Sequence, residues 1–395
     1  MKVYADHAAT TQIYKEVLEE MIPVLKDGYG NPSSIYSIGQ EAAKLLTKSR
    51  ETIAGCIGAH PREITFTSGG SEADNQAILT AAELGEKTGK KHMVTTRFEH
   101  HAILHTLQKL EKNGFRITWL EVHENGIVRP DEVEDAIEKD TILVSVMAAN
   151  NEIGTIQPIG EIGEICRRKG VLFHTDAVQA FGHIPIQTEE MRIDMLSLSA
   201  HKFHGPKGVG ILYARKGIQL TSLIEGGAQE RGKRAGTENL PSIVGMAKAA
   251  ELSFLYLEEN TRKVKQMQNE LIAGLEKIPH ARLNGDREKR LSGNVNFCFE
   301  GVDGESLVIL LDSKGIAVSS GSACASGSHD PSHVLLGIGL PAEMAKSSVR
   351  ISIGEDNTEE EISYLIQMVT EVVGYLRKMS PVWRELEKGE RQHMI

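Results

Sequence analysis

The chain has 395 residues, enough for two domains with their own hydrophobic cores, and its 40% apolar and 25% charged residues are ordinary for a globular enzyme. A net charge of −10 and a pI near 5.9 argue against nucleic acid or an anionic membrane as a partner. No apolar run approaches the roughly 20 residues of a membrane-spanning helix, and Met1–Asp6 lacks the apolar core of a signal peptide. We therefore expect a cytoplasmic protein.

From about residue 60 to 250, short apolar runs alternate with amphipathic stretches. The runs predict strands at 64–66, 92–95, 117–120, 141–146, 171–173, 195–198 and 209–213. The stretches between them predict helices at 72–84, 100–113, 129–137 and 160–169. This alternation is typical of an α/β fold, with a mostly parallel sheet covered by helices on both faces.

The pattern changes after about residue 250. A single long charged helix is predicted over 252–277, followed by strands at 294–299 and 349–353. An amphipathic helix closes the chain, with an apolar face formed by Ile362, Leu365, Met368, Val369, Val372 and Leu376. These elements predict a smaller α+β domain. We expect a large domain over 16–250 and a small domain formed by 1–15 and 251–395.

Polar side chains follow several predicted strands at the edge where ligands gather in parallel sheets. Asn151, Asp176 and Lys202 follow the fourth, fifth and sixth strands. A lysine sheltered in a Gly/Pro turn can be neutral and bind an aldehyde as a Schiff base, although Lys202 alone also fits a surface turn. Asp176 could keep a pyridinium nitrogen protonated or cap the next helix, and Gln179 could reach a ring oxygen.

A second group of residues suits a phosphate. The glycine-rich segment 67–75 follows a strand and opens a helix, so Gly70 and Ser71 are natural anion donors, although a plain helix cap has the same pattern. Ser199 and His201 flank Lys202 with further donors. His100 follows the second strand and could stack on a cofactor ring and move protons, or simply cap a helix.

Four scattered cysteines, with no Cys-x-x-Cys pair, predict neither a disulfide framework nor a structural zinc site. Cys56, Cys166 and Cys298 lie in apolar settings that suit packing. Cys324 differs, because the small residues of 319–328 offer nothing to pack with. That composition predicts a flexible loop able to carry a nucleophilic thiol. Because no Lys or Arg lies in this segment, a group from elsewhere in the protein would have to lower the pKa of the thiol.

A metal site at this segment is a weaker hypothesis. Cys324, His329 and His333 have a spacing that metal ligands tolerate, as do His201 and His204. Neither set has a second cysteine or an acidic partner, so we expect no resident metal. A transient contact of Cys324 with iron or an iron–sulfur cluster is left open.

Eight segments carry the motifs that point to a family: 4–11, 31–34, 66–75, 150–155, 174–179, 199–202, 234–239 and 319–324. In this order they resemble the NifS/IscS-like cysteine desulfurases, which are pyridoxal 5'-phosphate (PLP) enzymes of fold-type I in the class-V aminotransferase family. The resemblance implies a large domain with a mostly parallel, seven-stranded sheet and a smaller α+β domain.

The resemblance also implies roles for the catalytic residues. Lys202 would bind the PLP aldehyde as a Schiff base, and His100 would stack on the ring. Asp176 would pair with the pyridine nitrogen. Cys324 would take the sulfur and become a persulfide.

Further contacts are implied in the same way. Asn151 and Gln179 would contact the ring oxygen, and Asn151 with Arg350 would bind the substrate carboxylate. Thr237 would come from the partner subunit of a homodimer. The implied phosphate ligands are Gly70, Ser71, Ser199, His201 and Thr237.

The implied activity is the PLP-dependent removal of sulfur from L-cysteine, giving L-alanine and an enzyme persulfide. A sulfur-acceptor or iron–sulfur scaffold protein would then take the sulfur for iron–sulfur cluster assembly or other sulfur-containing biomolecules. Two alternatives stay open. A selenocysteine lyase or another fold-type I PLP enzyme would share Lys202 and Asp176 without needing Cys324. A non-enzymatic sulfur carrier would need Cys324 but would leave the other two residues unexplained.

Overall fold

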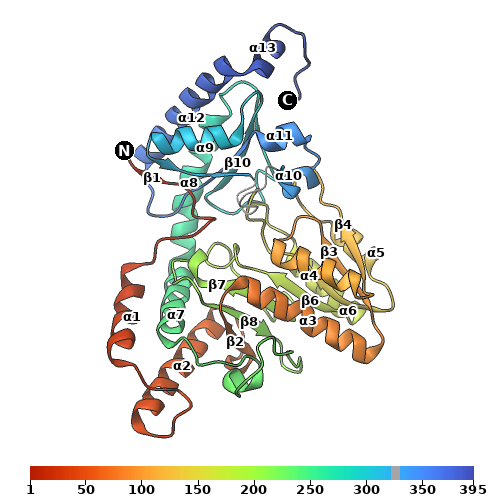
Figure 1. The fold of residues 1–395 in the computed structure, drawn as a ribbon, viewed down its shortest axis with the longest axis vertical. Helices are drawn as coiled ribbons and strands as arrows, with labels where there is room; N and C mark the ends of the chain where they lie inside the picture. The colour runs from red at the N-terminus through yellow and green to blue at the C-terminus, as the bar shows by residue number, and fades with distance from the viewer. Residues whose placement is uncertain (322–329) are drawn as a thin grey trace.

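A seven-stranded sheet forms the centre of the molecule, for which a computed structural model describes residues 1–321 and 330–395 (Figure 1). From one edge to the other, its strands are β2 (Ile64–Thr67), β8 (Gly210–Ala214), β7 (Met195–Ser199), β6 (Leu172–Asp176), β5 (Thr141–Ser145), β3 (His92–Thr96) and β4 (Arg116–Leu120). The five strands from β7 to β4 are parallel, and β8 runs antiparallel to both of its neighbours. The predicted mostly parallel α/β fold is confirmed.

Helices cover both faces of this sheet because its strands are apolar on both sides. Adjacent strand residues divide between two cores: Met93 and Leu143 belong to one, while Val94 and Val144 belong to the other. The first core also contains the apolar faces of α3 (Gly70–Thr88) and α4 (His101–Lys112). The second core receives side chains from α1 (Lys15–Asp27), α2 (Ser37–Cys56), α5 (Pro130–Ala136), α6 (Ile159–Lys169) and α7 (Leu240–Leu255).

The single helix predicted over 252–277 is wrong. The structure has two helices instead, α7 ending at Leu255 and α8 (Leu257–Leu275) beginning after Tyr256, with a bend of 71° between them. The two segments bury different sides: α7 packs Met246 against the central sheet, and α8 packs Leu271 in the second domain's core. One straight helix could not serve both cores.

A third core lies around a four-stranded antiparallel sheet, which Figure 1 shows above the central sheet. Its strands, in order, are β12 (Ser319–Ser320), β13 (Ser348–Ser352), β10 (Asn294–Phe299) and β9 (Ala281–Leu283). The helices of this part of the chain are α8, α9 (Gly304–Ser313), α10 (His333–Gly337), α11 (Ala342–Lys346), α12 (Glu359–Met379) and α13 (Pro381–Glu387). The predicted domain boundaries stay a prediction.

The N-terminus joins this third core. Strand β1 (Val3–Tyr4) pairs in parallel with β11 (Ile316–Ala317), and Val3 and Ala5 are buried among the residues of that core. The next residues connect to both sheets: the His7 N–H donates to the Ser352 carbonyl of β13 at 3.0 Å, and the Thr11 N–H donates to the His201 carbonyl after β7 at 2.9 Å. Within the described residues, no single helix is long and apolar enough to cross a membrane, and only the bent pair α7–α8 meets such a test together.

Side chains of the small sheet hold the loop that follows β5. Asn294 Nδ2 donates to the Asn151 carbonyl at 3.2 Å, and Asn296 Nδ2 donates to the Glu152 carbonyl at 3.1 Å. Asn151 is a predicted site residue, so the small sheet fixes the backbone of one wall of the candidate site.

Candidate active site

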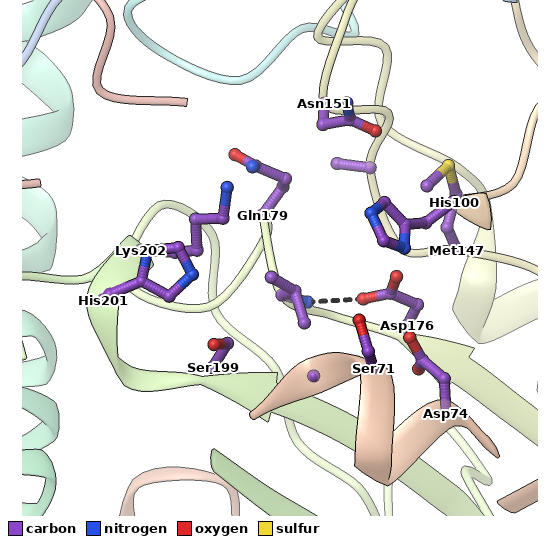
Figure 2. Close-up of a pocket in the computed structure, with 13 residues that line it drawn as sticks. Ser71, Asp74, His100, Met147, Asn151, Asp176, Gln179, Ser199, His201 and Lys202 are labelled. Carbon is purple, nitrogen blue, oxygen red and sulfur yellow. Dashed lines mark hydrogen bonds between the residues drawn. The ribbon is translucent and has the colours of Figure 1, made fainter. Parts of the chain in front are cut away.

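A cavity of about 260 Å³ opens at the carboxyl ends of β5, β6 and β7, where ligands gather in parallel sheets (Figure 2). Its lining residues are Gly70, Ser71, Asp74, His100, Met147, Ala149, Asn151, Asp176, Val178, Gln179, Ser199, His201 and Lys202. All of the predicted cofactor residues except Thr237 therefore meet in one cavity, although they come from segments scattered over more than a hundred residues.

Lys202 lies on the first turn after β7. Its Nζ donates to the Ala8 carbonyl at 2.6 Å and to the Ala9 carbonyl at 2.9 Å. Thr11 Oγ1 donates to the His201 carbonyl at 2.9 Å, which ties the N-terminal segment to the same turn. The amine is thus held by main-chain carbonyls at the wall of the cavity.

One end of the cavity is suited to an anion. The first amides of α3, at Gly70 and Ser71, have no acceptor within the helix, and they carry the positive end of its dipole. A Cβ at Gly70 would lie only 2.7 Å from Val178 Cγ2, so only glycine leaves this approach open. Ser199 lines the same end. This donor set fits a phosphate group.

Asp176 ends β6 and is 6% exposed. Its Oδ1 accepts the Val178 N–H at 2.9 Å. Burial raises its pKa to about 6, and the Val178 amide and the charge of Lys202 oppose that rise. The Val178 amide and the charge of Lys202 both favour the ionised form of Asp176, which suits a protonated ring nitrogen in the cavity.

His100 forms the N-cap of α4, and its Nδ1 accepts the Ala102 N–H at 3.2 Å. Burial first, and the charge of Lys202 second, lower its pKa to about 4. The imidazole is therefore neutral, and because Nδ1 accepts a hydrogen bond, its proton lies on Nε2. A flat neutral ring at the cavity wall suits stacking on an aromatic cofactor.

Three predicted residues are not in the cavity lining. Arg350 is 2% exposed, and its Nη2 pairs with Asp6 Oδ1 at 2.9 Å. Its Nη1 donates to the Asn151 carbonyl at 3.2 Å, and its Nε is buried without a hydrogen-bond partner. Thr237 is exposed on this single chain, and Cys324 lies outside the described residues.

The structure adds four lining residues that the sequence analysis missed: Asp74, Met147, Ala149 and Val178. Asp74 lies four positions after Gly70, so both occupy the same face of α3, and this spacing was a usable signal. Met147 and Ala149 directly follow β5, at the edge that already carried Asn151. Apolar residues at such an edge have no pattern that separates them from ordinary core residues.

Cys56, Cys166 and Cys298 are buried free thiols, as predicted. Burial is the largest cause that raises their pKa values to about 11, 12 and 11, respectively. Thiols of this kind stay protonated and unreactive at neutral pH.

One group of possible metal ligands, far from the cavity in sequence, occurs among the described residues: His280, Glu300 and His393. The two imidazoles stack with 3.7 Å between ring centroids and 14° between planes. A metal ion lies in the plane of an imidazole that binds it, so one ion could not suit both rings. Glu300 instead accepts hydrogen bonds from His393 Nδ1 at 2.7 Å and from the Met394 N–H at 2.6 Å.

Comparison with known proteins identifies the family. The aminotransferase class-V model matches residues 3–365. Cysteine desulfurase IscS of Clostridium botulinum (strain Hall) is 52% identical over 394 residues, 99% of each chain. The chain belongs to the class-V aminotransferases, among the NifS/IscS-like cysteine desulfurases. Enzymes of this family use PLP.

Solved structures agree with this assignment. A NifS-like protein superimposes with a TM-score of 0.89 at 40% identity, covering 95% of this cysteine desulfurase and 100% of that chain. SspA in complex with cysteine superimposes with a TM-score of 0.79 at 37% identity, covering 90% and 100%. The predicted fold-type I architecture and the family resemblance are confirmed.

Proposed function

We propose that this cysteine desulfurase binds PLP in the described cavity and uses it to take sulfur from L-cysteine, leaving L-alanine and a persulfide on Cys324. The observation that carries the proposal is the single cavity that joins the Lys202 amine, the buried Asp176 carboxylate and the open amides of α3. The cysteine complex of the related SspA supports L-cysteine as the substrate.

The residues fit PLP at each of its functional groups. Lys202 would hold the aldehyde covalently, and Asp176 would keep a proton on the pyridine nitrogen. The phosphate would be held by Gly70, Ser71, Ser199, His201 and the partner's Thr237. Asn151 and Gln179 would contact the ring oxygen, and the neutral His100 would stack on the ring.

Bound PLP would supply an aldehyde that takes up the substrate amine and a ring that accepts electrons from the reacting carbons. Lys202 and His100 would move protons at the substrate, since both reach the cavity. Arg350 would bind the substrate carboxylate. Asp6 and the Asn151 carbonyl hold the two Nη atoms of its guanidinium. The Nε–H has no hydrogen-bond partner among the described residues, so it is the donor that remains for a carboxylate.

Sulfur transfer would need no external oxidant. The Cys324 thiolate would attack the sulfur of the substrate, and the carbon–sulfur bond would break with its electron pair going to carbon. That carbon would then take a proton, so alanine leaves and the outer sulfur stays on Cys324. We further propose that an acceptor or iron–sulfur scaffold protein takes this sulfur in the cytoplasm for iron–sulfur cluster assembly or other sulfur-containing biomolecules.

The purified protein tests this proposal directly. We expect a visible absorption band from bound PLP and equal amounts of alanine and transferred sulfur from L-cysteine in the presence of a reducing thiol. The same assay with selenocysteine measures the competing lyase activity. A colourless protein that binds no added PLP would refute the proposal, and elemental selenium or selenide release far exceeding sulfur release would favour the lyase.

We also propose that the enzyme is a homodimer in which Thr237 completes the partner's phosphate site. Thr237 lies in the polar, glycine-rich segment 226–237, much of which is exposed on the single chain. The base of this segment is anchored by Glu230, which is buried and pairs with Arg50 at 2.6 Å. Tyr29 and Ile35 are 81% and 89% exposed, and apolar side chains this exposed favour a protein contact.

Mixed dimers test the cross-subunit role of Thr237. Thr237→Ala alone should bind PLP roughly tenfold more weakly, the loss of one hydrogen bond to a charged group. A heterodimer of one Lys202→Ala chain and one Thr237→Ala chain should regain one intact site, and with it about half of the wild-type alanine formation per dimer, as simple counting of sites predicts. If Thr237 served its own chain, the heterodimer would have no intact site, and its one site with Lys202 would bind PLP roughly tenfold more weakly, as in Thr237→Ala alone.

A further inference from the structure

Asp74 is a buried acid that the proposed mechanism does not use. It is 1% exposed, yet it lines the cavity, and its Oδ1 has no hydrogen-bond partner. Figure 2 shows its carboxyl on the cavity floor next to that of Asp176, with Asp74 coming from α3 and Asp176 from β6. Two carboxyls that share a buried site cannot both ionise, so one of them must hold a proton.

The surroundings decide which one holds it. Asp176 accepts a main-chain amide and lies within the field of Lys202, and both favour its charged form. Burial and the nearby Asp176 raise the pKa of Asp74 well above that of an ordinary aspartate, and a hydrogen bond from the Ser197 hydroxyl opposes that rise. Glu99, the third acid near this floor, also has a pKa raised, to about 8, by burial.

His174 does not supply a compensating positive charge. Its Nε2 lies 3.7 Å from Asp74 Oδ1, but burial lowers its pKa to about 3, so the ring is neutral. Both ring nitrogens are engaged with hydroxyls, Nδ1 with Ser145 at 2.9 Å and Nε2 with Ser197 at 3.0 Å. Among these groups, His174 is neutral and the raised pKa values of Asp74 and Glu99 favour their neutral forms, so Asp176 is the carboxyl most favoured to carry a charge.

We propose that Asp74 is a positioning residue: a neutral acid that donates its carboxyl proton to Asp176 and keeps Asp176 as the one anion available to the cofactor ring. The inference rests on the proposed role of Asp176 toward PLP. A donor on Asp176 stabilises the carboxylate and fixes its orientation, so the acid beneath it determines how firmly the ring nitrogen is held.

Two variants separate this role from simple packing. Asp74→Asn keeps the shape and an N–H donor, so PLP affinity, measured by equilibrium dialysis of the full-length protein, should stay within about threefold of the wild type. Asp74→Ala removes the donor, so affinity should fall roughly tenfold or more, as expected for a lost hydrogen bond to a charged group. Equal losses in both variants would mean that an ionised Asp74 is required, and equal retention would mean that Asp74 does not act on Asp176; either result overturns the proposal.

Infrared spectroscopy with isotope-labelled aspartate tests the proton itself, with and without PLP. At neutral pH the wild type should show the carbonyl band of a protonated aspartic acid, and Asp74→Asn should lose it. Glu99→Gln is the matched control, because it removes the other neutral acid and should leave the labelled aspartate band in place. An ionised Asp74 in the PLP-free protein would refute the proposal about Asp74, whether or not the protein binds PLP. Failure of the proposed PLP-dependent function would instead appear as a protein that binds no PLP.

Discussion

Replacing Lys202 by alanine should remove the covalent link to PLP and lower alanine formation at least roughly 10²- to 10⁴-fold, the range for loss of a positioned proton-transfer group. Lys202 ends the turn after β7 and lines the cavity, and the Ala8 and Ala9 carbonyls hold its amine. Anion donors and Asp176 would still bind PLP non-covalently, so the variant should retain a weaker, dialysable cofactor. Borohydride reduction followed by peptide mapping measures the link.

Lys207 offers a matched control for this prediction. It lies five residues further along the same Gly/Pro turn and is exposed, with no contact to the cavity. Lys207→Ala should therefore keep the reducible PLP link and the wild-type rate of alanine formation. If reduction attaches PLP to another lysine in the unaltered protein, the assignment of Lys202 is wrong.

Much of the fold followed from local patterns. Strand β10 has the predicted bounds, and the strands of the central sheet lie within a few residues of their predicted positions, because each is an apolar run between polar turns. Part of the candidate site could also be predicted from the sequence, for a related reason. Polar residues that end parallel strands must meet at one edge, so Asn151, Asp176 and Lys202 could be grouped before any contact was known.

The rest depends on contacts between distant segments. The break at Tyr256 carries no glycine or proline, and it occurs because α7 and α8 serve different cores. The pairing of Arg350 with Asp6 joins residues 344 positions apart, and the Ala8 carbonyl that accepts from Lys202 is 194 positions away. No periodicity or propensity within either segment encodes such a partner.

The role of Asp74, the acid next to Asp176, could not be predicted from the sequence for the same reason. Asp74 lies on the same face of α3 as Gly70, but an aspartate near a helix start is also explained as a favourable charge at the helix N-terminus. Its burial against Asp176 and His174 emerges only when α3 packs on β6 and β7. A functional acid and a capping acid have the same sequence signature here.

Cys324 should separate cofactor chemistry from sulfur transfer. In Cys324→Ala and Cys324→Ser, we expect L-cysteine to change the absorption spectrum of bound PLP as in the wild type, since Lys202, Asp176 and the anion donors are unaltered. Alanine formation should fall more than about a hundredfold, in line with the loss of a positioned reacting group. A thiol is already a few per cent ionised near neutral pH, whereas a serine hydroxyl is not, so serine should not rescue the rate.

The other three cysteines are the controls, and their settings explain why they cannot substitute. Cys56, Cys166 and Cys298 are buried, and their raised pKa values keep them protonated at neutral pH. Replacing each by alanine should cost about 1 kcal/mol of unfolding free energy, the centre of measured single-substitution effects, and should leave alanine formation unchanged. The decisive comparison is the rate of alanine release from L-cysteine by Cys324→Ala. A wild-type rate there would mean that no protein thiol takes the sulfur, and a lyase that releases sulfur directly would then explain why Lys202 and Asp176 are present while Cys324 is dispensable.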